Sequence, residues 1–322
     1  MASWDAHIKD ELRLVEEEIV RSASSRQPLL REIAMHVIQG GGKRLRPGVA
    51  LLSFRAVGGE DTGSVIKVSA GVELIHSATL IHDDINDGSD TRRGRIAAYK
   101  RYGIQNAIIT GDFLFVQGFR LGASHDSREI VEIVADACSA MAESEILQLD
   151  VERDSSLPLE TYMSIIDGKT ARPIMASAMV GAYFGKGSVD QIDALGKYGL
   201  NIGYAFQIVD DILDIDGKET AIGKPLGMDI MDSKANLPLM IAMHGKGKES
   251  ERIREIFSAP KKTKEEVDEA LALVRSSGAV DEARKNAAAF RDKALSSLDE
   301  IPSSKYRDSL RELAATVLER SN

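Results

Sequence analysis

The sequence predicts an all-α fold, arranged as a single-domain helical bundle. Long segments without proline carry apolar residues at helical spacing, and the eight prolines among 322 residues fall mostly at segment edges. No alternation of helices with strands rich in β-branched residues indicates an α/β fold. Hydrophobic residues make up 43% of the chain, enough for a sizeable core. We therefore expect one domain over residues 1–322.

Composition and charge exclude several classes of protein. The net charge of −9, from 41 basic and 50 acidic residues, argues against a general nucleic-acid binder. The single cysteine, Cys138, excludes an internal disulfide and a cysteine-based metal site. The first residues lack the apolar core of a signal peptide, and no apolar run approaches the roughly 20 residues of a membrane-spanning helix. We expect a cytoplasmic protein without a membrane span.

The helices are expected in a regular order along the chain. Residues 5–38 predict one or two amphipathic helices, broken near Ser22–Pro28. Glycines at 40–42 and at 58–59 are stop signals, so they separate these helices from the two that follow. Thr263 and Glu266 have the spacing of a capping box in the supporting C-terminal part, 249–322. The remaining helices are expected at about 47–57, from 63, within 95–124, at 127–150, from 159 and at 190–214.

A carboxylate cluster ends the apolar run that begins near Gly63. On a helix, Asp83 and Asp87 face the same way, because they are four residues apart, and Asp84 lies beside them. Oxygen ligands crowded on one face are typical of sites for hard divalent cations, and Mg²⁺ binds a few carboxylates together with substrate phosphates. The pattern alone also fits a solvated helix end.

The same spacing recurs at Asp210, Asp211 and Asp214, again at the end of an apolar run. The two copies start 127 residues apart (210 minus 83). This recurrence favours a functional interpretation over two unrelated helix ends. Two such clusters can face each other across a cavity and hold several metal ions around one diphosphate.

Basic residues gather close to the first cluster. The glycines at 40–42 precede Lys43, Arg44 and Arg46, which we interpret as a clamp for a diphosphate, since guanidinium groups bind phosphate oxygens in pairs. Arg92 and Arg93 follow the aspartates. His76 lies seven residues before Asp83, two turns away on the same helix face, from where it could give a proton or a hydrogen bond to phosphate.

Further polar groups accompany the second cluster. The Gly168-Lys169-Thr170 stretch lacks the upstream glycine and strand of a P-loop, so nucleotide binding is rejected, although Lys169 can still reach a phosphate. Gln207 shares a helix face with Asp210 and Asp211. Lysines in the glycine-bearing loop that follows, Lys224 and Lys234 among them, could close over a charged ligand.

These motifs, in this order, resemble the trans-isoprenyl diphosphate synthases, or polyprenyl synthetase family. The matching stretches are GGKRLRP at 41–47, ELIHSATLIHDDIND at 73–87 with TRRG at 91–94, GKT at 168–170, FQIVDDILD at 206–214 and GKPLGMD at 223–229. They span a motif-bearing core of about 40–240. The resemblance implies an all-α isoprenoid synthase fold around a deep central cavity, a homodimer, and the transfer of prenyl groups from an allylic diphosphate to isopentenyl diphosphate.

The resemblance also implies roles for particular residues. The two aspartate-rich motifs, Asp83, Asp84, Asp87 and Asp210, Asp211, Asp214, would hold Mg²⁺, or Mn²⁺ in its place, on the allylic diphosphate. Asp83, Asp84, Asp87, Lys169, Asp210 and Asp211 form the expected catalytic set. Arg92 would contact the allylic diphosphate, and Lys43, Arg46, His76 and Arg93 would bind isopentenyl diphosphate. The residues lining the allylic side would be Lys169, Thr170, Gln207 and Lys224, with Lys234 a further addition.

Product length is expected to depend on the helix that carries Asp83. In the family, bulky residues four and five positions before the first motif stop the growing tail, and here these are Thr79 and Ala78. With Ile75 two turns before the motif, we expect a floor that admits twenty or more carbons. Three alternatives stay open: a short-chain farnesyl diphosphate synthase, a terpene cyclase, and a non-catalytic subunit of a heteromeric synthase. Asn236 and the Ala171-Arg172-Pro173 stretch depart from the family's pattern.

Overall fold

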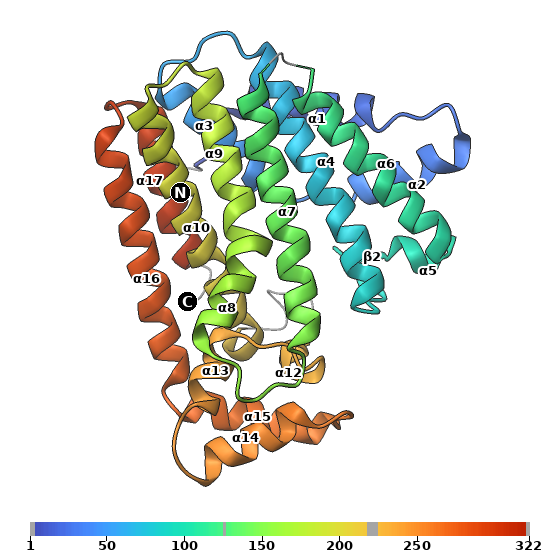
Figure 1. Ribbon diagram of the computed structural model, residues 1–322, viewed down its shortest axis with the longest axis vertical. Helices are drawn as coiled ribbons and strands as arrows, with labels where there is room; N and C mark the ends of the chain where they lie inside the picture. Colours follow the sequence, from blue (N-terminus) through green and yellow to red (C-terminus); the bar gives the residue numbers. More distant parts are fainter. Residues whose placement is uncertain (1–3, 125–126, 218–224, 320–322) are drawn as a thin grey trace. The chain divides into compact units, whose positions relative to one another are not determined.

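The computed structural model describes residues 4–124, 127–217 and 225–319. Within these ranges the regular secondary structure consists of helices, apart from one hairpin of two short strands (Figure 1). The predicted all-α class is therefore confirmed. Lys224, which was predicted to bind substrate, lies outside the described residues.

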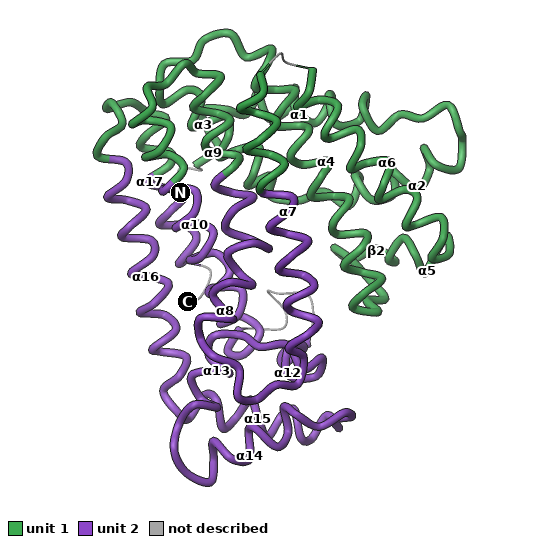
Figure 2. The backbone as a smooth tube through the Cα atoms, in the orientation of Figure 1, with its two compact units in different colours: residues 1–136, 176–196, 299–310 green, residues 137–175, 197–298, 311–322 purple. Residues whose placement is uncertain are grey.

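The contacts within the chain divide it into two compact units (Figure 2). Unit 1 comprises Met1–Asp136, Ala176–Gly196 and Asp299–Leu310, and unit 2 comprises Ala137–Met175, Lys197–Leu298 and Arg311–Asn322. Four long helices contribute to both units: α7 (Arg128–Asp150), α9 (Arg172–Phe184), α10 (Val189–Asp216) and α17 (Lys305–Glu319). The expectation of a single domain stays a prediction.

Unit 1 contains the N-terminal helices at close to their predicted bounds. The break between α1 and α2 falls where it was expected, because Pro28 occupies the first turn of α2 and Gln27 caps that turn by accepting the Leu30 N–H at 2.7 Å. The elements are α1 (Lys9–Ser22), α2 (Pro28–Ile38), α3 (Leu45–Ala56), α4 (Gly63–Asn86), β1 (Thr91–Arg92), β2 (Arg95–Ile96), α5 (Ala98–Tyr102) and α6 (Ile104–Gly122).

Helix α4 is the core of unit 1. It packs along α6, its most extensive neighbour, and also against α1 and α3. The α4–α6 approach is close because a Cβ atom added at Gly71 would lie 2.7 Å from the Gly118 carbonyl oxygen. In the described part of the chain, α4 is the one helix long and apolar enough to cross a membrane, but 67% of its most apolar window is buried within the protein, as in a core helix.

Unit 2 contains the remaining helices. The predicted capping box is present: Thr263 accepts the Glu266 N–H and the Glu266 carboxylate accepts the Thr263 N–H at the start of α15. Helices α14 and α15 pack against each other (Figure 1). The elements are α8 (Leu159–Ile166), the π-helix η1 (Asp167–Ala171), α12 (Met228–Met231), α13 (Leu237–Met243), α14 (Lys248–Ser258), α15 (Lys264–Ser276) and α16 (Ala279–Ser297), followed by η2 (Leu298–Glu300) across the unit boundary.

The two departures from the family's pattern have local explanations. The π-helical turn Asp167–Ala171 joins α8 to α9 without a break, and Pro173 follows directly as the second residue of α9, next to this local change in the helical hydrogen-bond pattern. Asn236 caps α13 by accepting the Leu239 N–H at 3.0 Å, and its amide donates to Asp229 at 3.0 Å. Neither residue disrupts the helices around it.

Candidate active site

The first aspartate motif forms the C-terminal end of α4 in unit 1. Asp83 and Asp87 are partly buried, whereas Asp84 is 5% exposed. The Asp84 carboxylate accepts a hydrogen bond from Arg92 Nε at 2.7 Å and forms an ion pair with Arg92 Nη2 at 2.5 Å. Burial raises the pKa of Asp84, Arg92 opposes this rise, and neighbouring Asp87 adds to it. Arg92 was predicted to bind the allylic diphosphate, and in the structure its guanidinium group contacts Asp84 of the first aspartate motif.

The end of a helix is an unfavourable place for three carboxylates, because the unpaired carbonyl groups there carry partial negative charge. A bound cation would relieve this repulsion. Among the described residues, no group of three or more His, Cys, Asp or Glu side chains is arranged to hold a metal ion by itself. The oxygen-only motif therefore fits a Mg²⁺-like ion whose remaining ligands come from substrate phosphate and water.

A hairpin that the sequence analysis did not predict positions the arginines. Strand β1 pairs with β2 in antiparallel register, Arg92 opposite Arg95, and the turn residues Arg93 and Gly94 have φ values of 52° and 72°. These positive values are typical of the two-residue turns that suit hairpins. The Arg93 guanidinium lies against Gly42, where a Cβ atom would be 2.9 Å from Arg93 Nη1. Glycine at 42 therefore lets the basic loop approach Arg93.

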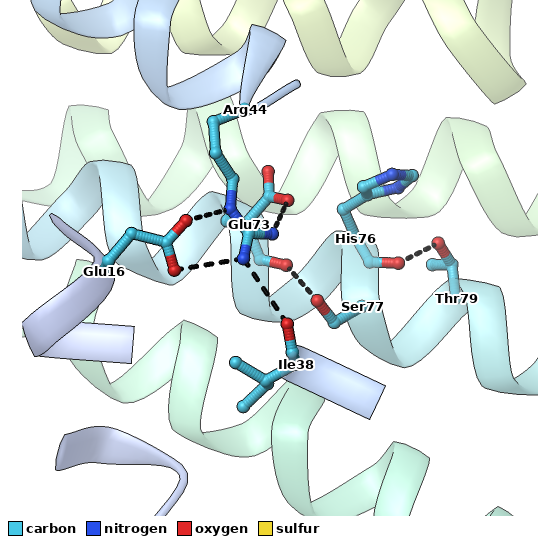
Figure 3. Close-up of polar contacts among 7 residues, drawn as sticks. All are labelled: Glu16, Ile38, Arg44, Glu73, His76, Ser77 and Thr79. Carbon is cyan, nitrogen blue, oxygen red and sulfur yellow. Dashed lines mark hydrogen bonds and ion pairs between the residues drawn. The ribbon is translucent and has the colours of Figure 1, made fainter. Parts of the chain in front are cut away.

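The basic loop itself differs from its prediction in one respect. Lys43, Arg44 and Arg46 were expected to form the clamp together, but Arg44 is 9% exposed and its guanidinium is bound by Glu16 and Glu73 (Figure 3). Arg44 is therefore not a phosphate ligand in this structure, because its donors already have carboxylate partners. Lys43 is exposed and Arg46 partly buried.

In unit 1 the charges of Arg46 and Arg93 act on His76. Burial lowers the pKa of Arg46, and Arg93 lowers it further, while Glu73 opposes both. Burial, Arg46 and Arg93 hold the pKa of His76 well below its usual value. His76 is therefore a neutral imidazole at physiological pH, suited to donate a hydrogen bond to phosphate. The alternative role considered from sequence, proton donation, is disfavoured.

The second aspartate motif lies at the C-terminal end of α10 in unit 2. Asp210 is exposed, whereas Asp211 and Asp214 are 4% and 2% exposed. Both oxygens of Asp214 accept backbone N–H groups, from Met228 at 3.2 Å and Asp229 at 3.1 Å. Asp214 therefore holds the start of α12 in addition to the metal-binding role predicted for it.

Three hydrogen bonds from protein groups meet the carboxylate of Asp211. Its carboxylate accepts the Tyr162 hydroxyl at 2.5 Å, the Leu237 N–H at 3.0 Å and the Gln207 amide at 3.0 Å. Burial and the charge of Asp229 nevertheless raise the pKa of Asp211 to about 8, against the lowering effect of the three hydrogen bonds. A cation beside Asp211 would favour its ionised form, so this motif also fits a metal.

The predicted allylic-side residues of unit 2 form a hydrogen-bond chain to Asp211. Thr170 donates to the side-chain oxygen Oε1 of Gln207 at 2.7 Å, and the side-chain nitrogen of Gln207 donates to Asp211. Lys169, in the π-helix, donates to Glu145 at 2.6 Å and to Gln148 at 2.7 Å. π-helical turns are frequent at functional sites. Lys234 is partly buried, and its backbone N–H donates to the Asp229 carbonyl oxygen.

The expected chain-length residues lie along α4. Ala78 is fully buried and Ile75 is 4% exposed, next to Gly118 of α6. Thr79 is partly buried, and its hydroxyl donates to the His76 carbonyl oxygen at 2.9 Å (Figure 3). Their role as a floor for the product stays a prediction.

Comparison with known proteins decides the family. The polyprenyl synthetase family model matches residues 27–274, which is most of the chain. The chain belongs to the polyprenyl synthetase family. Octaprenyl diphosphate synthase of Haemophilus influenzae is 36% identical over 312 residues, which cover 97% of this chain and 94% of the relative. Short chain isoprenyl diphosphate synthase of Methanothermobacter thermautotrophicus is 38% identical over 314 residues, or 96% of each chain.

Solved structures agree with this assignment. A polyprenyl synthase from Caulobacter crescentus, crystallised with calcium and isoprenyl diphosphate, superposes with a TM-score of 0.94 at 36% identity. The match covers 99% of this chain and 97% of that one. The family, the all-α fold and the trans-prenyltransferase class predicted from sequence are confirmed.

In this polyprenyl synthetase, sequence reasoning missed several residues that contact the predicted site. Glu73 and Glu16 bind Arg44, and Tyr162 binds Asp211. A signal existed for Glu73, because an acidic residue three positions before His76 in an apolar helix requires a buried partner. No comparable signal marked Tyr162, which is 49 residues from Asp211 along the chain.

Proposed function

We propose that this polyprenyl synthetase adds isopentenyl diphosphate to an allylic diphosphate and forms an all-trans polyprenyl diphosphate of twenty or more carbons. One observation carries the proposal: α4 bears two chemically different groups suited to diphosphates. His76 lies among arginines, whereas Asp83, two turns closer to the C-terminal end of α4, belongs to a cluster of carboxylates. Seven residues separate them, a rise of about 10 Å along the helix. One diphosphate can bind arginines directly, and the other can bind carboxylates through metal ions.

We propose Mg²⁺ as the resident ion, with Mn²⁺ as a substitute. The proposed ligands are Asp83, Asp84 and Asp87 in unit 1 and Asp210, Asp211 and Asp214 in unit 2. The all-oxygen donor set and the raised pKa values of Asp84 and Asp211 support a hard divalent cation. When bound, the ions withdraw negative charge from the departing diphosphate and so favour its cleavage from the allylic carbon.

The side chains of the protein supply the rest of the catalysis. Arg92 and Lys169 bind the allylic diphosphate and stabilise the negative charge that develops as the bond to carbon breaks. Lys43, Arg46, His76 and Arg93 hold isopentenyl diphosphate so that its double bond attacks the allylic cation. The proton lost in the last step passes to the released diphosphate, so no side-chain base is required. Thr170, Gln207, Lys224 and Lys234 complete the allylic side.

The residues before the first motif support a long product. Ala78 and Thr79 are small, so neither closes the path of a growing tail along α4 in the way a bulky aromatic side chain would. The octaprenyl diphosphate synthase of H. influenzae supports a product longer than twenty carbons. The short chain synthase of M. thermautotrophicus is about as similar, so a direct measurement of product length is needed.

A homodimer and a cytoplasmic location are also proposed. Helix α6 exposes four large apolar side chains: Ile104, Ile108, Ile109 and Val116, which are 42–59% exposed. A row of exposed aliphatic side chains on one helix is typical of an interaction surface, and a second copy of this chain is the proposed partner. Neither nucleic acid nor a membrane span has a part in the proposed function.

Product analysis tests the proposed activity. The purified protein would receive Mg²⁺, isopentenyl diphosphate and, in separate reactions, allylic starters of five, ten, fifteen and twenty carbons. We expect polyprenyl diphosphates of twenty or more carbons by mass spectrometry, and none from Asp83→Ala. The variant Asp281→Asn, at an exposed position on α16, serves as a matched control. A fifteen-carbon endpoint would support the short-chain alternative, and no consumption of isopentenyl diphosphate would refute the proposal.

A further inference from the structure

Arg44 lies in the middle of the predicted phosphate-binding sequence and yet is directed into the protein. Its Nη1 donates to Glu73 at 2.6 Å, and its Nε and Nη2 donate to the two oxygens of Glu16, the latter at 3.0 Å. A fourth contact, from Nη2, reaches the Ile38 carbonyl oxygen at 3.5 Å (Figure 3). Glu73 is 3% exposed, so this is a largely buried ion cluster.

The partners of Arg44 come from three different helices. Glu16 lies on α1, Ile38 ends α2 and Glu73 lies on α4, while Arg44 itself is the residue before α3. The backbone of Arg44 has φ 50° and ψ 40°, a left-handed conformation that non-glycine residues rarely adopt. Such a conformation persists where the surroundings determine it. The guanidinium contacts therefore fix the junction between the loop that carries Lys43 and the first turn of α3, which carries Arg46.

Glu73 also lies near the cations that are proposed to bind isopentenyl diphosphate. Its negative charge raises the pKa of Arg46 and of Arg93, against burial and against the repulsion among the arginines. Figure 3 shows the side chains of Glu73 and His76 on the same side of α4, one turn apart. A carboxylate in this position keeps like charges together before the substrate arrives.

We propose that the cluster of Glu16, Arg44 and Glu73 is a positioning device for the isopentenyl diphosphate subsite. Arg44 does not touch the substrate. It holds the loop so that Lys43 and Arg46 meet the diphosphate, and Glu73 keeps Arg46 and Arg93 together. The inference rests on the proposed function, because it assigns positioning residues to one of the two substrates.

Charge and positioning give opposite expectations for Glu73, which makes the inference testable. If Glu73 acted only through its charge, Glu73→Gln would remove a carboxylate near an anionic ligand and tighten binding. A positioning role predicts weaker binding. The double variant Arg44→Met/Glu73→Gln removes one charge of each sign, so the net charge near the ligand is unchanged. It also avoids leaving a buried charge without its partner, which would threaten folding.

Binding of isopentenyl diphosphate would be measured by titration calorimetry, without an allylic substrate, so that no turnover is needed. We expect the dissociation constant of the double variant to rise roughly ten- to hundredfold, the scale at which a misplacement of about 1 Å is felt. The KM of the allylic substrate should change less than about twofold. Arg44→Lys, which keeps the charge but loses the planar fork, should recover only part of the affinity.

Each outcome has a defined meaning. The inference would be overturned if the double variant folds and its affinity for isopentenyl diphosphate is unchanged, or if it loses affinity equally for both substrates. Turnover by the wild type would still support the proposed function in that case. A wild type that binds no isopentenyl diphosphate would overturn both. If the double variant does not fold, Glu16→Gln takes its place, since Glu16 is 42% exposed and the change is mild. We expect a several-fold selective loss of affinity, and an unchanged constant would refute the inference.

Discussion

Replacing Asp211 by asparagine should make the metal-free protein more stable and the enzyme inactive. Asp211 is 4% exposed, and burial together with Asp229 raises its pKa to about 8. Asparagine resembles the protonated acid and fits the same contacts, with its oxygen accepting the Tyr162 hydroxyl and the Leu237 N–H. Rotation of the Gln207 amide would then let it accept from the new Asn nitrogen and donate to Thr170.

The sign and size of the effect follow from the pKa of Asp211. The folded protein keeps the Asp211 proton up to about pH 8, whereas the unfolded chain loses it near 3.8. Between these values the folded state binds more protons, so the Asp211 contribution to the free energy of unfolding falls as pH rises. Each unit corresponds to about 1.36 kcal/mol, so wild type should lose up to about 4 kcal/mol relative to Asp211→Asn between pH 5 and pH 8.

Denaturant unfolding in the presence of a chelator would measure this difference at pH 5, 6.5 and 8. The wild-type and variant values should diverge as pH rises, whereas Asp281→Asn, an exposed control on the same unit, should run parallel to wild type. Condensation by Asp211→Asn should fall on the order of a hundredfold or more. Parallel pH profiles for wild type and Asp211→Asn would refute the assignment of a raised pKa to this carboxyl group.

Three further perturbations test other parts of the structure. Ala78→Phe should shorten the product by at least one five-carbon unit in mass spectrometry. The variant should also lose a modest amount of stability through overpacking, since Ala78 is fully buried. A product of unchanged length would contradict the proposed floor. His76→Gln should lessen the loss of unfolding free energy as pH falls below about 6.5. In wild type the unfolded chain binds a proton on His76 in this range, whereas the folded protein does not, because burial depresses the pKa of His76. Equal losses in the two proteins would argue against a neutral His76. Ile109→Glu on α6 should yield monomers in sedimentation experiments, whereas the control Val189→Glu, at an 82% exposed position, should sediment like wild type. If both variants sediment like wild type, α6 is excluded as the dimer surface.

Helix positions were predictable because local signals agree with the fold. Pro28, the glycines at 40–42 and the Thr263–Glu266 capping box mark helix ends that the structure confirms. These signals act over four residues or fewer, so they do not depend on distant parts of the chain. The hairpin at Thr91–Ile96 was not predicted, since two-residue strands are too short to show a periodic pattern.

The direction of individual side chains was harder to predict from the sequence than the positions of the helices. Lys43, Arg44 and Arg46 are chemically alike in the sequence, and only the presence of Glu16 and Glu73 decides that Arg44 points inward. Those partners lie 28 and 29 residues away. Tyr162 on α8 likewise donates to Asp211 on α10 across 49 residues of sequence, a separation that no short motif encodes. Motifs thus indicated the chemistry, while tertiary contacts decided that Arg44 binds carboxylates inside the protein.

Both aspartate motifs place carboxylates where negative charge is costly in the absence of cations. The first motif puts three carboxylates at the negative end of α4, and Asp84 has a pKa raised by burial. The second buries Asp211 and Asp214 close to Asp229. Selection for folding alone would favour neutral residues at such positions, because buried carboxylates cost free energy unless they are paired. Their presence at the ends of two apolar helices is explained when cations compensate the charge, so these carboxylates are themselves an argument for the proposed metal-dependent function.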